Sequence, residues 1–473
     1  MRPPGDRSVR PAVAAVAAAL VIAGCGLADG PAEPNVCLAP VIWNASAERN
    51  PTNVLSAFVV ASVRQADSMK VRYGAGAALD SATPALTANG DSVVVPVLGL
   101  LPSTRYVLQL VAFNRCGTGT SLPLSFTTEA VPADIPSYTA SGSAPSPGYI
   151  VISAGRYGLV IDNTGRVVWY HRFPNGPGLN FQAQLNGRYV ARPPTSPGED
   201  GMWIELAPDG SVTRTFGCAR GLQPRMHDVI VLSDGSYWLL CDEIRTMDLT
   251  AQGASPQARV LGTSIQQRNV RGDVLFEWSP FDHLTVELSA LEPDDRAGLV
   301  INWTHGNAID LDLDGSLYLS FRNLSEVTKI DPRTGAVVWR MGGARNQIAF
   351  ENGDAPAFAR QHGVRITDGG LVLLDNLGHA GGSRAERYAI DDARRTARLI
   401  GFYDSRAGVI AEVGGTTQPL PAGHTLVSFG SGGGVAEYDA AGTVVWSLTG
   451  NPGYIFRAQR IRSLYHPGFG YQR

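Results

Sequence analysis

Three of the eight histidines in this sequence occupy similar positions relative to a following turn. His227 and His362 each lie eight residues before the last glycine of an expected turn, and His305 lies ten residues before one. We expect each to begin the innermost strand of a repeated sheet, so that the three imidazoles meet around one opening. Imidazoles gathered at a polar opening can bind an anion, transfer protons, or do both. A single histidine would more often cap a strand, but the shared position favours a functional role.

Four further polar residues are candidates for the same site. Asn307 holds the eighth position before its turn, and Arg322 lies on the expected second strand of the unit that His305 begins. A guanidinium there offers planar donors to a sulfate or a phosphate. The alternative for Arg322 is a surface ion pair with Glu326. In the last repeat, Thr416 and Thr417 follow the position equivalent to the histidines.

The elements that position these residues follow from a repeated unit. The segments 165–169, 335–339 and 442–446 share the pattern Gly-x-Val-Val-Trp, and Asp-Gly or Gly-rich turns separate alternating apolar runs between them. Four-stranded units that repeat about every 40–50 residues are typical of a β-propeller. We therefore expect an all-β chain with a six-bladed β-propeller over residues 148–473, in which residues 454–458 complete the ring.

A smaller all-β domain is expected before the propeller, over residues 37–130. Its segment 101–114 resembles the tyrosine-corner strand of fibronectin type III domains, in which the hydroxyl of Tyr106 would bond back to the preceding turn. This resemblance implies a fibronectin type III-like β-sandwich that spaces or positions the propeller. Residues 131–147 are rich in Pro, Ser and Ala and are expected to form a linker.

The first residues predict export. Arginines precede a short apolar run that ends in Ile-Ala-Gly before Cys25, so residues 1–25 read as a signal peptide that resembles those of bacterial lipoproteins. The resemblance implies a lipid anchor on Cys25, a tether over 26–36, and a periplasmic or extracellular position at the cell envelope. The alternative is an ordinary signal peptide that contains a cysteine.

The four remaining cysteines suit an oxidising compartment. They allow three sets of pairings. One set would close the N-terminal domain through Cys37 and Cys116 and join two neighbouring strands through Cys218 and Cys241. A zinc site is not expected, since the chain has no CxxC or HExxH motif. The net charge of -3 gives no reason to expect a nucleic-acid partner.

Over residues 145–473 the chain resembles bacterial arylsulfate sulfotransferases (arylsulfotransferases, ASST). The likeness is carried by Met-His-Asp at 226–228, His-Gly-Asn at 305–307 with Arg322 one strand later, and Gln-His at 361–362. The family uses no cofactor, so none is expected here.

The resemblance assigns a role to each candidate. His362 matches the histidine that takes up the sulfuryl group, and His227 and His305 match the two histidines that flank it. Asn307 and Arg322 match the residues that bind the sulfate.

The implied activity is transfer of a sulfuryl group from a phenolic sulfate ester to a phenol, without the nucleotide donor PAPS. The family also uses a threonine, for which Thr416 or Thr417 is the candidate, and two chains could pair as a homodimer. Two alternatives stay open. One is a non-catalytic binding or scaffold propeller of the cell envelope, and the other is a hydrolase in which water replaces the phenol.

Overall fold

The computed structural model describes residues 37–174, 180–193, 201–351, 358–405 and 408–468. The signal peptide and Cys25 predicted for residues 1–25, and the tether predicted for 26–36, lie outside the described residues. Within them the regular structure is almost entirely β-strand, as predicted. The helices are single turns: η1 (Thr250–Gln252), α1 (Pro280–His283), η2 (Leu288–Ala290), α2 (Pro293–Arg296) and η5 (Pro421–Gly423).

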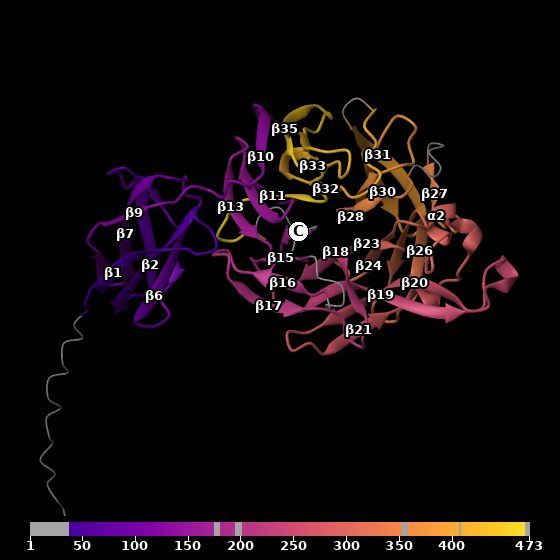
Figure 1. Cartoon of the computed structure of the whole chain (residues 1–473), viewed down its shortest axis with the longest axis horizontal. Coiled ribbons are helices and arrows are strands. Elements are labelled where there is room, and N and C mark those ends of the chain that lie inside the picture. Colours follow the sequence, from indigo (N-terminus) through magenta and orange to yellow (C-terminus); the bar gives the residue numbers. More distant parts are fainter. Residues whose placement is uncertain (1–36, 175–179, 194–200, 352–357, 406–407, 469–473) are drawn as a thin grey trace, which may run out of the picture.

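The N-terminal part consists of two antiparallel sheets (Figure 1). One contains β1 (Val41–Arg49), β2 (Ser56–Arg64) and β6 (Ser92–Leu98). The other is built on β3 (Ser68–Ala75) and β7 (Arg105–Asn114), with the short strands β4 (Ser81–Ala82), β5 (Leu86–Thr87), β8 (Gly117–Thr120) and β9 (Leu124–Thr127). Alternate residues of β2, β3 and β7 are buried between the sheets, and the hydroxyl of Tyr106 accepts the N–H of Leu101 at 2.8 Å. The hydroxyl therefore reaches back to the preceding turn as expected.

Six further sheets follow within the described residues, and each contains a run of four antiparallel strands. Figure 1 shows them arranged one after another around a common centre. The first sheet contains β36 (Ala458–Ile461), β11 (Tyr149–Ala154), β12 (Tyr157–Asp162) and β13 (Val167–Arg172). The second contains β14 (Phe181–Ala183), β15 (Tyr189–Ala191), β16 (Trp203–Leu206) and β17 (Val212–Phe216). The third contains β18 (Gln223–Val231), β19 (Tyr237–Met247), β20 (Ala258–Arg268) and β21 (Val274–Trp278), and β22 (Ile301–Asn302) pairs with β20.

The other three sheets complete the circuit. The fourth sheet contains β23 (Gly306–Leu311), β24 (Leu317–Phe321), β25 (Glu326–Ile330) and β26 (Val337–Gly342). The fifth contains β28 (His362–Thr367), β29 (Gly370–Asp375), β30 (Arg384–Asp391) and β31 (Thr396–Asp404), with β27 (Ala349–Phe350) at the edge. The sixth contains β32 (Thr416–Pro419), β33 (Thr425–Ser428), β34 (Val435–Tyr438) and β35 (Val444–Asn451), with β10 (Ser137–Gly142) at the edge.

The two ends of this region are joined by strand pairing at two places. β36 from the C-terminal end pairs with β11, and β10 from the N-terminal end pairs with β35. Only Ala458 of the predicted closing segment 454–458 is in the closing strand. Residues 137–142 of the expected linker form a sheet strand, because their backbone pairs with that of β35 over six residues.

Side chains near the innermost strands link neighbouring sheets through backbone N–H groups. Five such bonds, at 2.7–3.2 Å, are donated by Val231 to Gln184, Ile309 to Asp228, Ile366 to Asp310, Arg460 to Gln418, and Ala183 to Gln459. At the contact between β28 and β32, Gly363 has a φ of +62°, and a Cβ there would lie 2.8 Å from the Cα of Thr416. Only glycine allows this approach. The inner strands are thus held by polar bonds and close backbone contact, not by apolar packing alone.

Both disulfides of the set described above are present. Cys37 and Cys116 are bonded with their Cα atoms 5.4 Å apart, and Cys218 and Cys241 with theirs 6.1 Å apart. The second bond differs from the expectation in one respect, because Cys218 follows β17 while Cys241 lies in β19, so it joins two different sheets. Among the described residues, no helix has the length and apolar character needed to span a membrane.

Replacing Tyr106 with Phe should lower the free energy of unfolding of the N-terminal part by about 1 kcal/mol, because the hydrogen bond to Leu101 is lost while the buried ring is kept. Tyr73→Phe is the control, since no hydrogen bond of its hydroxyl is found among the described residues. Urea unfolding of both variants measures the difference. Equal stability of the two variants would show that the Tyr106 hydroxyl does not stabilise the turn.

Candidate active site at the histidine cluster

The structure brings His227, His305 and His362 together. His227 lies in β18, His305 immediately precedes β23, and His362 begins β28; these are the end strands of three successive sheets. The rings of His227 and His305 are 5.0 Å apart between centroids in an edge-to-face arrangement, and Phe456 packs 5.8 Å from His227. A positive charge on His362 would lower the pKa of both other imidazoles, so its ring lies within electrostatic range of theirs. The predicted meeting of the three is therefore found.

His362 offers one ring nitrogen to the site. Its side chain is buried, and Nδ1 lies 3.1 Å from the carbonyl oxygen of Arg360 and 2.8 Å from Oδ1 of Asn376. A backbone carbonyl can only accept, so Nδ1 carries the hydrogen. No described residue bonds to Nε2, whose lone pair is free to act as a base or a nucleophile.

All three imidazoles are neutral at neutral pH. Burial, followed by the charge of Arg225, holds the pKa of His227 and of His305 well below the ordinary value. Burial also lowers the pKa of His362 to about 4, against the opposing effect of the bond to Asn376. The site therefore contains uncharged rings among fixed positive charges, which is the state in which an imidazole is nucleophilic.

Arg322 is a cation of this site without a carboxylate partner among the described residues. Its backbone N–H donates to the carbonyl of His305 at 3.1 Å, which fixes it beside that histidine. Its guanidinium donates to Oδ1 of Asn323 at 3.0 Å and, at 3.5 Å, to the carbonyl of Glu412, while Nε has no partner. No carboxylate within the described ranges forms a salt bridge with it, and Glu326 pairs with Arg340 instead. The predicted surface pair with Glu326 is thus absent.

The other cations near the histidines are already paired with carboxylates. Arg225 forms a salt bridge with Asp242, and Arg360 forms one with Asp295 at 2.8 Å. Their charges still act on the imidazoles. Arg322 is therefore the guanidinium best able to meet an anionic ligand.

The remaining predicted residues are less free. Asn307 is buried and donates through Nδ2 to the carbonyl of Gln361 at 2.7 Å, so it joins β23 to the residue before His362, and its Oδ1 has no partner. The hydroxyl of Thr416 bonds to the backbone of Ala458. The hydroxyl of Thr417 is buried without a partner. Neither threonine hydroxyl contacts a histidine among the described residues.

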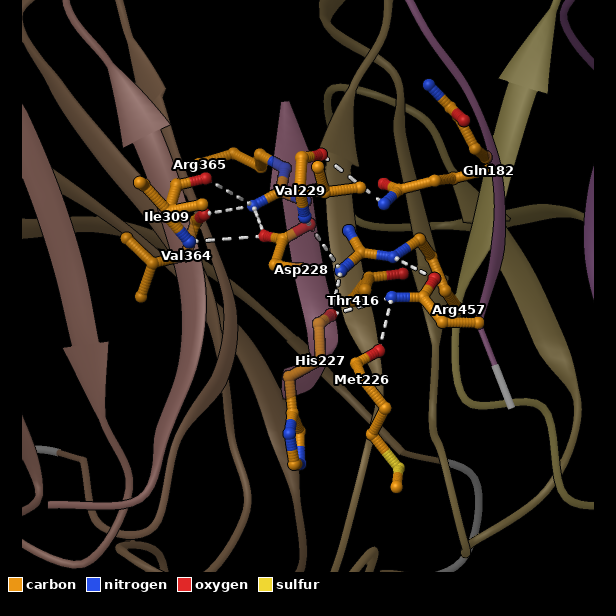
Figure 2. Close-up of polar contacts among 12 residues, drawn as sticks. Gln182, Met226, His227, Asp228, Val229, Ile309, Val364, Arg365, Thr416 and Arg457 are labelled. Atoms are coloured by element: carbon orange, nitrogen blue, oxygen red, sulfur yellow. Dashed lines mark hydrogen bonds and ion pairs between the residues drawn. The ribbon is translucent and has the colours of Figure 1, made fainter. Parts of the chain in front are cut away.

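His227 is fixed by a buried polar cluster centred on Asp228 (Figure 2). The carboxylate of Asp228 accepts from Arg365 at 2.9 Å, from Arg457 at 3.0 Å and from the N–H of Ile309 at 3.2 Å. Burial acts to raise the pKa of Asp228, but the two guanidiniums hold it below its ordinary value. Figure 2 shows the imidazole of His227 pointing away from this cluster. The cluster therefore supports the backbone of the histidine and leaves its ring to the site.

Two more bonds hold the backbone at His227. Arg457 donates to its carbonyl at 3.1 Å, and Asn180 donates to the same oxygen at 2.7 Å. Of these supporting residues, Asp228 stands beside a predicted histidine and could have been suspected from sequence. Arg457, Asn180 and Asn376 carry no such signal, because their contacts form only when segments far apart in the sequence pack together.

Replacing Asp228 with Asn should destabilise the protein by about 3–5 kcal/mol, because two buried guanidiniums lose their shared negative partner. Urea unfolding followed by tryptophan fluorescence measures the effect. Asp294→Asn, at an exposed position of α2, is the control and should stay within about 0.5 kcal/mol. A loss below about 1 kcal/mol for Asp228→Asn would contradict the importance of this ion cluster.

Comparison with known proteins adds an independent finding. The arylsulfotransferase (ASST) family model matches residues 222–451, a segment that includes the three histidines and Arg322. No curated protein matches the chain.

Solved structures of low identity cover the larger part of the chain. They include a protein of unknown function from Bacteroides caccae, at 15% identity and a TM-score of 0.43 over 67% of this chain and 100% of that one. A virginiamycin B lyase from Staphylococcus aureus matches at 8% identity and a TM-score of 0.36, over 66% and 99%. Over residues 222–451 the chain is thus similar to the arylsulfotransferase (ASST) family.

Proposed function

We propose that this protein is an aryl sulfotransferase that moves a sulfuryl group from a phenolic sulfate ester to a phenol. The observation that carries the proposal is the arrangement of Arg322, a guanidinium without a carboxylate partner among the described residues, beside three neutral imidazoles. An anion is the ligand that such a charge favours, and a neutral imidazole is the group that can attack it. The family match over residues 222–451 agrees with this chemistry.

In the first step, the Nε2 lone pair of His362 attacks sulfur, an N–S bond forms, and the bond between sulfur and the aryl oxygen breaks. The electron pair of that bond leaves on the phenolate, and the ring becomes an N-sulfoimidazolium that keeps its hydrogen on Nδ1. By analogy with phosphoryl transfer, charge builds on the leaving oxygen. Arg322, and the second amide hydrogen of Asn307, would hold the non-bridging oxygens.

His227 or His305 supplies the proton to the leaving phenolate. Both rings are neutral in the empty site, and the negative charge of the bound ester favours the protonated form of either one. In the second step the same group takes the proton of an acceptor phenol, whose oxygen attacks sulfur and breaks the N–S bond. The acceptor leaves as the new sulfate ester, and His362 is restored. Such acid–base help contributes about 10²–10⁴-fold.

Storing the sulfuryl group on a histidine removes the need for a nucleotide donor. The sequence has no Gly-rich phosphate-binding loop of the kind that such donors require. We further propose that the six sheets are the blades of a propeller, with a fibronectin type III-like domain before it. A lipid anchor on Cys25 would hold the chain at the periplasmic or extracellular face of the cell envelope.

His362→Asn is the sharpest test of the nucleophile. The Asn side chain can keep a donor near the position of Nδ1, toward Arg360 and Asn376, while Nε2 is removed. Transfer from a chromogenic aryl sulfate to a phenol should fall by at least about 10³-fold. His379→Asn, at an exposed position, is the control. Near-wild-type transfer by His362→Asn would exclude His362 as the nucleophile.

Intact-protein mass spectrometry after alkaline quench provides the second measurement. Donor alone should add one sulfuryl group to the wild type and none to His362→Asn. Turnover without any trapped adduct would contradict the two-step scheme. Product ratios with and without phenol separate transfer from hydrolysis, and absence of turnover with every ester tested would favour a binding or scaffold protein.

The acid limb of kcat/KM should lie near pH 4. This constant reports the pKa of groups in the free enzyme, and His362 must be unprotonated to attack. Because its pKa is lowered to about 4, activity should persist as pH falls through 6.5 and be lost near 4. Recovery of activity on return to pH 7 controls for unfolding. An acid limb near pH 6.5 would show that His362 is not the buried base described here.

A further inference from the structure

Asn376 contacts His362 with an orientation that its other partners determine. It directly follows β29 and is 1% exposed. Its Nδ2 donates to the carbonyl of Ala411 at 2.6 Å and to that of Gly414 at 3.0 Å. Since carbonyl oxygens only accept, the amide cannot be turned round without losing both bonds. Its Oδ1 therefore faces Nδ1 of His362, at 2.8 Å.

The ring of His362 consequently meets two acceptors at the same nitrogen, Oδ1 of Asn376 and the carbonyl of Arg360. The tautomer with hydrogen on Nε2 would place the Nδ1 lone pair against both oxygens. The tautomer with hydrogen on Nδ1 satisfies them and leaves the Nε2 lone pair uncommitted. Second partners of this kind decide which nitrogen of a histidine is available.

The segment that holds Asn376 also contacts Arg322. Its two acceptors lie in the segment 411–414, where the N–H of Ala411 donates to the hydroxyl of Ser383 at 2.7 Å. That hydroxyl donates in turn to the backbone carbonyl of Asn376 at 2.7 Å. Arg322 lies 3.5 Å from the carbonyl of Glu412 in the same segment. One short segment thus contacts both the support of His362 and the guanidinium.

We propose that Asn376 is a positioning residue that holds His362 as the Nδ1–H tautomer and presents its Nε2 to the substrate. The catalytic consequence rests on the proposed function, whereas the tautomer does not. When the sulfuryl group is on Nε2, the ring is cationic and its Nδ1–H remains. The bond to Asn376 then becomes charge-assisted and stronger than in the free enzyme. Asn376 would therefore stabilise the intermediate more than the resting ring.

A neutral acceptor suits this position because of the charges around it. Arg322 and Arg457 act to lower the pKa of His362, and the imidazoles of His227 and His305 share the site. A carboxylate in place of the amide would counter these charges and favour the imidazolium, which cannot attack. Asn376→Asp should therefore impair the nucleophile although it preserves an acceptor for Nδ1–H.

The test records ¹⁵N spectra of histidine-labelled full-length protein, with His362→Asn used to assign the signals of His362. In the wild type at pH 7, Nδ1 should show the shift of a protonated ring nitrogen and Nε2 that of an unprotonated one. In Asn376→Asp, both ring nitrogens of His362 should stay protonated up to a higher pH than in the wild type. The acid limb of kcat/KM should move to higher pH by at least about one unit. Asn376→Ala should lower kcat by about 10–100-fold with a smaller change in KM.

Asn346→Asp is the matched control. Asn346 is exposed and also bridges backbone groups, donating to the carbonyl of Ile348 and accepting from the N–H of Gly342. Its variant should leave the pH profile unchanged. A wild-type spectrum with hydrogen on Nε2 overturns the proposal, as does a folded Asn376→Asp variant with an unmoved acid limb. If Asn376→Asp does not fold, the wild-type spectrum and Asn376→Ala decide the same question.

The two proposals fail in different ways. The expected tautomer in a protein that transfers no sulfuryl group would support the position of Asn376 and overturn the sulfotransferase. Transfer through His362 with hydrogen on Nε2 in the resting protein would support the sulfotransferase and overturn the role of Asn376.

Discussion

The buried carboxylate of Asp228 is the point on which the inner part of the structure depends. It lies in β18, accepts a backbone N–H from β23, and binds one guanidinium from β28 and another from the segment just before β36. Desolvation of these charges is costly, and only their mutual proximity offsets that cost. Four sheets must therefore keep their relative positions for these contacts to form. The backbone of His227 is fixed as a result.

The chemistry of the site follows from an imbalance of charge. Arg225 and Arg360 have carboxylate partners, while Arg322 has none in the described part of the chain. Burial keeps the imidazoles uncharged, so they do not add to the positive charge. This distribution of charge is what the proposed function requires, since it favours an anionic ligand and keeps a lone pair available on an imidazole. In the proposed mechanism Arg322 binds the anion and His362 attacks it, so two different residues carry the two roles.

The sequence allowed the all-β class and the approach of the three histidines to be expected, and the disulfides that form are one of the three sets of pairings that it left open. These depend on local patterns, such as the spacing of His227 and His362 from their turns. The supports of the site could not be expected in the same way. Asn376 acts through the carbonyls of Ala411 and Gly414, and Arg457 acts through Asp228, contacts that exist only after distant segments meet.

The same reason explains where the structure differs from what local patterns predict. Asn307 has a partner that its spacing does not predict, because its Nδ2 bonds to the carbonyl of Gln361 beside His362. Residues 137–142 have the composition of a linker, yet they form a strand because β35 offers them a free edge. The composition of a segment shows which conformations it can adopt. The neighbouring strand in the folded protein then determines which of them it takes.

The closure of the ring by β36 has a consequence for biosynthesis. Arg457 stands immediately before this strand, so a residue that pairs with Asp228 and holds the carbonyl of His227 is translated after all three histidines of the site. A growing chain can form its early sheets but cannot complete the surroundings of its histidines. The surroundings of the imidazoles are thus complete only once Arg457 is in place, and a chain that stopped before it would carry His227, His305 and His362 without a formed site.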